Sequence, residues 1–250
     1  MLETIHHGRV QEIKLARPPA NALNAEMVEA ITGALQEAAE TADAVVISGL
    51  PGMFSAGLDV PQLLHFDRGQ MSLFWQSFLR MLKTTACMPV PTAFALTGHA
   101  PAGGIVMALF GDCRIMPRGR FKTGLNEVQV GLVVPPPIHR ALVRTVGFHT
   151  AERILVAGEL MLSERAHEIG LVDELVDDPG VAVERAVEWC QEHLALPRTP
   201  MLLTRRMARA DLHGFFSDGS ELGVEQFVDI WFSEPTQKAL RTLVERLSAR

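Results

Sequence analysis

The sequence has few cysteines, and they stand far apart. Its 250 residues include three, Cys87, Cys113 and Cys190, and no two of them form a CxxC pair. Disulfide-rich domains and structural zinc sites depend on numerous or closely spaced cysteines, so neither is expected here. We interpret all three as buried small hydrophobic residues of a protein in a reducing compartment, and we expect no metal site.

An excess of positive charge and a long apolar run are also missing. The formal net charge is −6, which provides no general field for nucleic acid, and no basic stretch is interleaved with aromatic residues. The opening MLETIHHGRV lacks the basic-then-apolar pattern of a secretory signal, and no apolar run approaches a membrane span. These features predict a cytoplasmic protein that binds neither nucleic acid nor membrane.

Two common functional motifs are absent as well. The glycines of AGG at 102–104 do not complete the GxGxxG fingerprint of dinucleotide-binding folds. Ser55 does not stand in a GxSxG elbow, and no histidine can be assigned as its base, so a serine hydrolase is not supported. His6, His7 and His65 show no metal-ligand spacing.

Apolar runs of strand length alternate with segments of helical spacing. Buried strands are predicted at 44–49, 91–98 and 113–117, with further extended segments at 2–6, 10–15 and 171–176. Helices are predicted after the N-cap residue Asn24 and at 69–85, 102–112, 136–146, 150–157, 163–169 and 180–195. This alternation predicts an α/β fold with a substantial parallel sheet.

The prolines Pro197 and Pro200 mark a change in the character of the chain. Residues 1–196 form the predicted α/β core, and 197–250 form a predicted helical C-terminal region. We expect such a region to pack on a partner subunit.

Two turns place small residues between a buried strand and the start of a helix. They are MFSAGLDV at 53–60 and GHAPAGGIVM at 98–107. Free N–H groups at a helix start favour negative charge, and two of them aimed at one oxygen form an oxyanion hole. Either turn alone is more often structural, so this pattern leaves both interpretations open.

Three motifs in order carry a resemblance to a known family. FSAGLD (54–59), HAPAGG (99–104) and GLNEVQVG (124–131) resemble the crotonase (enoyl-CoA hydratase/isomerase) superfamily. The likeness extends from RPPANALNAEM (17–27) to FVDIWF (227–232), which is nearly the whole chain. It implies a crotonase-type spiral of ββα units with a helical C-terminal region that builds homotrimers, often paired into hexamers. It also implies an acyl-CoA thioester substrate and no cofactor, because coenzyme A is part of the substrate.

The resemblance assigns roles to residues of the first two motifs. The backbone N–H groups of Leu58 and Gly103 would form the oxyanion hole, and the stretch with Ala56, Gly57, Asp59 and Val60 would line the CoA pocket. From turn chemistry alone, Asp59 is expected to order its own turn rather than to perform chemistry.

The residues of the third motif favour one reaction of the family. Hydration is easiest with two carboxylates, and Glu127 matches one of them, but Val106 stands where hydratases carry the other. A single carboxylate suits a 3,2-enoyl-CoA isomerase, with Glu127 as acid and base and Asn126 in the substrate pocket. The alternatives are a hydratase that uses Glu127 alone, an acyl-CoA thioesterase, and a non-catalytic acyl-CoA-binding protein.

Several other polar residues have two possible roles. His99 could face the acyl group or be a packed, hydrogen-bonded histidine. Arg205, Arg206 and Arg209 are expected on a solvated helix face or in subunit salt bridges, and Lys238 could reach the CoA phosphates. Asp112 is expected to be structural.

Overall fold

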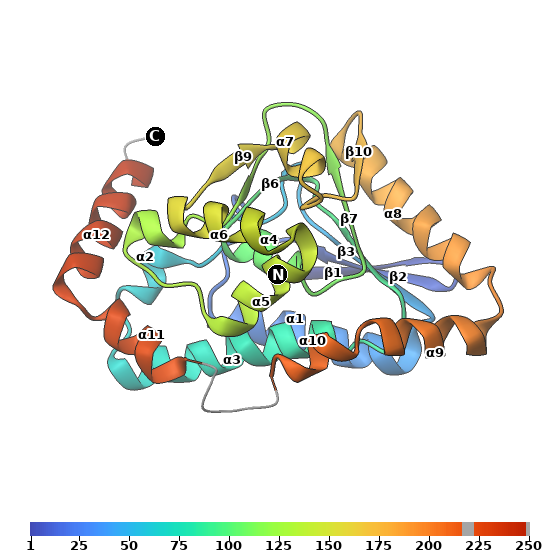
Figure 1. Ribbon diagram of the computed structural model, residues 1–250, viewed down its shortest axis with the longest axis horizontal. Helices are drawn as coiled ribbons and strands as arrows, with labels where there is room; N and C mark the ends of the chain where they lie inside the picture. Colours follow the sequence, from blue (N-terminus) through green and yellow to red (C-terminus); the bar gives the residue numbers. More distant parts are fainter. Residues whose placement is uncertain (217–222, 249–250) are drawn as a thin grey trace.

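The structure is a computed structural model that describes residues 1–216 and 223–248. The predicted C-terminal region 197–250 therefore includes residues 217–222, 249 and 250, which lie outside the described residues. Figure 1 shows the chain with its helices arranged around a central pair of sheets.

The larger sheet has six strands in the order β1-β2-β3-β5-β7-β10. Only β1 and β2 pair antiparallel, and the remaining neighbours are parallel. The strands are β1 (Leu2–His7), β2 (Val10–Leu15), β3 (Ala44–Ser48), β5 (Thr92–Ala95), β7 (Cys113–Pro117) and β10 (Glu174–Val176). Every residue of β3, β5 and β7 is buried, as expected for parallel strands that are covered on both faces. The predicted α/β architecture with a parallel sheet is confirmed.

A smaller sheet has four short strands in the order β4-β6-β8-β9. They are β4 (Gly52–Met53), β6 (Gly98–Pro101), β8 (Lys122–Gly124) and β9 (Leu160–Leu162), and only β8 and β9 pair antiparallel. Three successive strand pairs, β3–β4, β5–β6 and β7–β8, each give one strand to each sheet before a helical segment. The chain therefore winds as ββα units.

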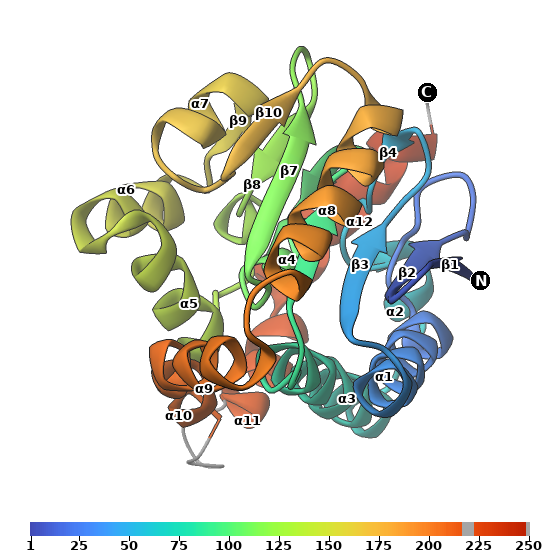
Figure 2. The same cartoon turned by 90° about the vertical axis from the view of Figure 1, so that its right-hand side faces the viewer.

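The helices surround these sheets. They are α1 (Ala25–Thr41), α2 (Val60–Leu63), α3 (Arg68–Ala86), α4 (Gly103–Ala108), the 3-10 helix η1 (Glu127–Val130), α5 (Pro136–Val146), α6 (Phe148–Ala157), α7 (Ser163–Glu168), α8 (Pro179–Leu194), α9 (Arg198–Ala208), α10 (Ala210–Gly214), α11 (Val224–Trp231) and α12 (Glu234–Ser248). Figure 2 shows α8 across one face of the larger sheet, and α1 and α3 together at the base of the molecule.

Local sequence signals explain where several helices start. The Asn24 side chain accepts the Met27 N–H at 2.9 Å and caps α1, as predicted. Asp67 and Gln70 form a reciprocal capping box at the start of α3. Helix α8 fits closely against the sheet because Ala182, Ala186 and Cys190 face it.

The prediction of one strand over 91–98 is wrong. The chain forms β5, turns at Leu96 and Thr97, and enters the smaller sheet as β6 from Gly98. A Cβ at Gly98 would lie 2.0 Å from the carbonyl carbon of Gly52, so only glycine allows β4 and β6 to approach this closely. The predicted helix over 102–112 is also shorter, since α4 ends at Ala108 and the chain turns toward β7.

Two of the three cysteines follow the prediction. Cys113 and Cys190 are buried, and burial raises the pKa of both thiols, that of Cys190 to about 12. The prediction is wrong for Cys87, which is exposed because it ends α3 at the surface. All three are free thiols.

No described helix combines the length and the apolar character that a membrane crossing requires. The C-terminal helices pack on the rest of the chain, since Leu212, Phe227 and Trp231 belong to the same hydrophobic core as the strands and α3. Trp75 of α3 stacks on Phe227 of α11 with ring centroids 3.6 Å apart. Phe74 and Phe78 of α3 are buried with Trp75.

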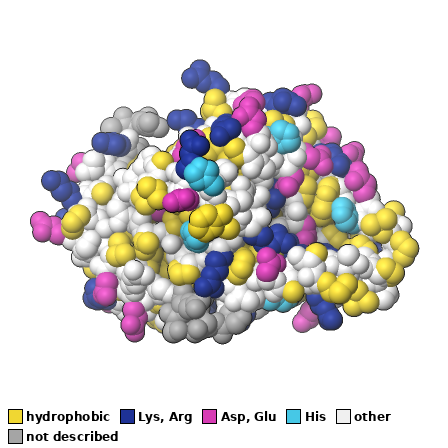
Figure 3. All heavy atoms as spheres, viewed as in Figure 1, with side chains coloured by type: hydrophobic (Ala, Val, Ile, Leu, Met, Phe, Trp, Pro, Cys, Tyr) yellow, Lys and Arg dark blue, Asp and Glu magenta, His cyan; other side chains and the backbone are white. Residues whose placement is uncertain are grey.

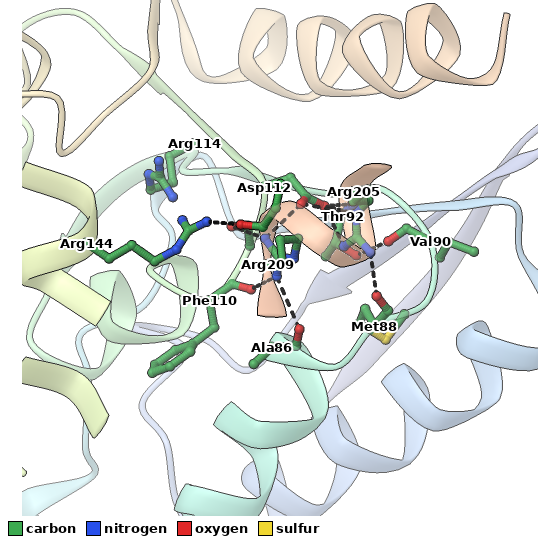
Figure 4. Close-up of polar contacts among 12 residues, drawn as sticks. Ala86, Met88, Val90, Thr92, Phe110, Asp112, Arg114, Arg144, Arg205 and Arg209 are labelled. Atoms are coloured by element: carbon green, nitrogen blue, oxygen red, sulfur yellow. Dashed lines mark hydrogen bonds and ion pairs between the residues drawn. The ribbon is translucent and has the colours of Figure 1, made fainter. Parts of the chain in front are cut away.

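Two arginines point inward, contrary to the prediction of a solvated face or a subunit salt bridge. Figure 4 shows Arg205 and Arg209 converging on Asp112 of the same chain. Their guanidinium groups lie 2.7 Å from the Asp112 carboxylate and also donate to backbone carbonyls at the end of α3 and of α4. Asp112 further accepts the Thr92 N–H at 2.7 Å. This buried cluster anchors α9 and α10 to the sheet.

Burial and neighbouring arginines lower the pKa of Arg209 to about 10, although Asp112 opposes the shift. Asp112 is therefore structural, as predicted, and removing its charge would leave buried guanidinium groups without their counter-ion.

We expect Asp112→Asn to lower the free energy of unfolding by about 3 kcal/mol, because breaking a buried ion pair strands its partner. Asp43→Asn is the matched control: Asp43 also pairs with two arginines, Arg9 and Arg198, but at the surface. Its cost should stay below about 1 kcal/mol. Urea unfolding of both variants measures the difference. Equal losses of unfolding free energy would show that burial does not make the Asp112 ion pairs more important than those of Asp43.

Candidate active site

The turn of FSAGLD is held from behind by residues 20–23. Ala56 N–H donates to Ala20 O at 2.9 Å. Leu23 N–H donates to Gly57 O at 2.8 Å, and Leu23 O accepts the Asp59 N–H at 3.1 Å, so Leu23 bonds the residues before and after Leu58. The buried Asn21 amide donates to Leu15 O at 3.1 Å and to Phe54 O at 2.9 Å. The backbone of this turn is therefore fixed on its inner side.

The second turn lies directly against the first. A Cβ built on Gly57 would stand 2.9 Å from the backbone nitrogen of Gly103, and one built on Gly103 would stand 3.1 Å from Gly57 Cα. Gly57 also has a φ of +83°, which L side chains rarely adopt. Gly104 repeats the constraint, because its Cβ would meet Ser55 O at 2.6 Å. Small residues in both motifs are thus required by contact between the two turns.

Two backbone donors remain free at this contact. Within the described chain, the N–H groups of Leu58 and Gly103 donate to no acceptor, whereas their neighbours Gly57, Asp59 and Ala102 all donate. Gly103 is the first residue of α4, where an N–H has no acceptor within the helix. One unpaired donor from each turn, at a place where the turns touch, fits the binding of a single oxygen atom.

Glu127 reaches the same region through the smaller sheet. Strand β8 pairs with β6, and Ala102 N–H donates to Gly124 O at 2.8 Å, so the chain that follows Gly124 starts beside the second turn. Glu127 then opens η1, and its carbonyl accepts Leu132 N–H at 2.9 Å. The pairing of two short strands therefore unites the second and third motifs.

Burial sets the electrostatics of Glu127. Its Oε2 atom is buried without a hydrogen-bond partner in the described residues. Desolvation raises the pKa of Glu127 to about 7, and a hydrogen bond from its own backbone N–H opposes part of the shift. A carboxyl group with this pKa can both accept and return a proton near neutral pH.

The position one helical turn beyond Gly103 is apolar. Val106 is buried with 1% of its surface exposed, and it belongs to the main hydrophobic core. No proton-transfer group is therefore present at this point of α4. Asn126, next to Glu127, is half-buried, and its side chain does not cap η1.

The residues predicted to line the CoA pocket have different surroundings. Ala56 is half-buried, whereas Val60 is buried and packs in the main core. Asp59 caps α2 by accepting Gln62 N–H at 3.2 Å, and it pairs with Arg17 at 2.8 Å. Asp59 orders its turn as turn chemistry predicted, and its contact with CoA stays a prediction.

Of the remaining candidate residues, two are packed and hydrogen-bonded within the protein and two are exposed. His99 lies on β6, where its Nδ1 accepts Lys122 N–H at 3.0 Å and its ring packs on Phe121, so it is a packed, hydrogen-bonded histidine. Burial and the nearby Lys122 lower the pKa of His99. Arg206 and Lys238 are exposed on α9 and α12. Ser55 is buried, and its hydroxyl donates to Asn21 O at 2.8 Å, which leaves it unsuited to act as a nucleophile.

Sequence reasoning missed the residues that hold the site from outside the motifs. Asn21 and Arg17 brace the first turn, and Thr236 of α12 donates to Gly131 O at 2.7 Å, just after η1. Asn21 has a φ of +47°, a conformation that asparagine tolerates better than most residues. An asparagine within RPPANALN was the available signal, whereas Thr236 carries none because its partner is a distant backbone carbonyl.

Comparison with solved structures identifies the fold. The structure of human mitochondrial delta3-delta2-enoyl-CoA isomerase superimposes with a TM-score of 0.92 and 27% identity, covering 100% of this chain and 98% of that one. An enoyl-CoA hydratase from Bacillus halodurans has the same fold, with a TM-score of 0.85 and 20% identity over 96% and 99% of the two chains. The predicted crotonase-type spiral is confirmed.

Comparison at the level of sequence gives the family. The family model described as enoyl-CoA hydratase/isomerase matches residues 6–250. The chain therefore belongs to the enoyl-CoA hydratase/isomerase family. It is 28% identical to mitochondrial enoyl-CoA delta isomerase 1 of Mus musculus over 100% of this chain and 88% of that protein. A probable enoyl-CoA hydratase of Mycobacterium avium (strain 104) is 31% identical over 74% of this chain and 72% of its own.

The raised pKa of Glu127 predicts a pH-dependent stability. Between the ordinary value of 4.5 and the folded value of about 7, the folded state holds a proton that the unfolded state has released. Stability should therefore fall as pH rises through this window, by on the order of 3 kcal/mol. Glu127→Gln removes this loss, so it should be more stable than the parent chain at pH 8 and nearly equal at pH 4.5.

Denaturant unfolding at both pH values measures this difference. Glu245→Gln, a change at an exposed glutamate of α12, is the control and should leave the pH dependence intact. A stability difference between Glu127→Gln and the parent chain that does not change with pH would show that Glu127 titrates normally.

Proposed function

We propose that this protein is a 3,2-enoyl-CoA isomerase, which moves a double bond of an acyl-CoA from the 3,4 to the 2,3 position. The observation that carries the proposal is one carboxylate with a buried Oε2 atom that has no partner in the described residues, Glu127. Its segment begins beside the turn that holds Gly103, where the described chain leaves two backbone N–H groups without an acceptor, and position 106 is valine. The similarity to isomerases over the full chain supports the same reaction.

Each part of the site has a role in this reaction. The N–H groups of Leu58 and Gly103 bind the thioester oxygen, and Glu127 removes a proton from the α-carbon. The electron pair moves onto that oxygen, giving a dienolate that the two donors stabilise. Protonated Glu127 then returns the proton to the γ-carbon, which leaves the double bond at the 2,3 position. No water enters the products, and no step requires a metal or redox cofactor.

The polar environment of the substrate is proposed from the same residues. Asn126 offers its amide to the acyl-CoA, and Ala56, Gly57, Asp59 and Val60 lie along the turn that would receive the CoA moiety. Exposed Lys238 is a candidate partner for the CoA phosphates, because α12 contacts the segment that follows Glu127 through Thr236.

A hydratase is the second candidate, and the similarity to the probable mycobacterial hydratase favours it. Hydration needs a group that activates water as well as one that delivers a proton. Glu127 alone would have to perform both tasks, since Val106 cannot. For this reason we expect hydration to be the slower reaction.

We also propose that the chain assembles as a homotrimer, alone or as a pair of trimers. No residue of helix α9 is fully buried within the described chain, although Arg205 points inward to Asp112, and the apolar Leu203 and Met207 are exposed. Figure 3 shows hydrophobic side chains gathered at the end of the molecule that carries α9. Beneath α9 lies a cavity of about 470 Å³ lined by Trp189, Pro197 and Met201, among others. A partner subunit that packs on α9 would cover this apolar surface.

The first test compares the two reactions on one preparation. The protein should convert 3-enoyl-CoA substrates into their conjugated 2-trans isomers, and it should hydrate 2-enoyl-CoA far more slowly. Both rates are measured by absorbance of the conjugated thioester over several chain lengths. A hydration rate above the isomerisation rate would assign the protein to the hydratases.

The second test is the isosteric change Glu127→Gln. Loss of the acid and base should lower kcat by roughly 10²- to 10⁴-fold while the affinity for CoA thioesters is unchanged. Near-normal turnover of the variant would remove Glu127 from this role.

In the parent protein, kcat/KM should rise with pH through an apparent pKa near 7, because the free enzyme must hold Glu127 ionised to accept the proton. Absence of any acyl-CoA turnover in the parent protein would instead favour an acyl-CoA-binding function without catalysis.

A further inference from the structure

Ala102 has a backbone conformation that its side chain does not favour. Of the non-glycine residues that the structure describes, only Asn21 and Ala102 have a positive φ, and both have a value of 47°. Asn21 braces the first donor turn, and Ala102 stands immediately before Gly103 in the second. The ψ of Ala102 is −122°, far from the left-handed helical region that asparagine also visits. Strain of this kind persists only where the surrounding structure imposes it.

Hydrogen bonds on both sides impose this conformation on Ala102. Its N–H donates to Gly124 O at 2.8 Å, which ties it to β8, and its carbonyl accepts Val106 N–H at 3.0 Å, which ties it to α4. The residue therefore connects the strand pair to the helix start and directs the N–H of Gly103.

The methyl group of Ala102 lies at the contact between the two donor turns. It lies 3.2 Å from the point where a Cβ on Gly57 would stand, so it packs against the backbone of the first turn. Ala102 is half-buried, and its Cβ is the side-chain atom among the three atoms nearest to the point where a Cβ on Gly57 would stand. Glycine would adopt this φ without strain, but it would leave the gap between the turns unfilled.

We propose that Ala102 is a positioning residue, whose methyl group sets the distance between the Leu58 and Gly103 N–H groups. The proposal rests on the proposed function, since it concerns the donor pair that would bind the thioester oxygen. Preorganised donors work only while their spacing matches one oxygen atom, and small displacements have large effects on rate. The strained backbone of Ala102 thus lowers local stability, while its methyl group fixes the geometry of the Leu58 and Gly103 N–H groups.

The test replaces Ala102 by glycine. Ala102→Gly should lower kcat of isomerisation roughly 10-fold, less than the roughly 10²- to 10³-fold loss of an entire donor, while KM and the melting temperature do not fall. Ala102→Ser restores a Cβ and should recover most of the rate. Ala42→Gly makes the same change at the C-cap of α1, where φ is −105°, and should leave kcat unaltered.

A second measurement keeps the proposal separate from the isomerase assignment. Acetoacetyl-CoA bound to the protein should show an increased enolate fraction in its ultraviolet absorbance, whichever reaction the protein catalyses. That fraction should fall in Ala102→Gly and stay constant in Ala42→Gly. An unchanged enolate fraction and unchanged kcat in Ala102→Gly would overturn the role of Ala102, whereas absence of isomerisation with a lowered enolate fraction would overturn only the proposed reaction.

Discussion

The contact between the backbones of Gly57 and Gly103 is the constraint on which the rest of the site depends. A Cβ at Gly57 would stand 2.9 Å from the Gly103 nitrogen and one at Gly103 would stand 3.1 Å from Gly57 Cα, so the contact leaves little room for a side chain. Among the described residues, the Leu58 N–H beside Gly57 and the N–H of Gly103 itself have no acceptor. The contact joins two consecutive ββα units, so it can form only if both units wind in register. Much of the surrounding structure, including the buried amide of Asn21 and the pairing of β6 with β8, holds these two turns together.

The site combines donors that belong to the backbone with one side chain whose charge is controlled by burial. Backbone donors tolerate few substitutions around them, which explains the run of small residues in both motifs. Glu127 instead lies in an environment that disfavours its ionised form, and its pKa of about 7 is the consequence. The same burial lowers the stability of the folded state above pH 7, where Glu127 must ionise. This is the cost of a carboxyl group that can exchange a proton near neutral pH.

Sequence patterns predicted the large elements because each has a long, consistent signal. The three buried strands and helices such as α1 and α3 follow from apolar runs, helical spacing and capping residues. The strands of the smaller sheet were missed because they have only two to four residues, too few to show a period. Arg205 and Arg209 were placed outside for a similar reason, since only a distant aspartate makes their burial favourable.

By itself, the sequence determined the α/β class, the two turns of small residues and, through its resemblance to a family, Glu127 as the single candidate acid and base. These features are local, because they depend on residue type and on spacing within a short stretch. Only the tertiary structure decided that the two turns touch, that Glu127 is desolvated, and that Asp112 turns two arginines inward. It also revealed the strained Ala102, because a backbone dihedral angle is set by contacts with distant strands and not by the residue itself.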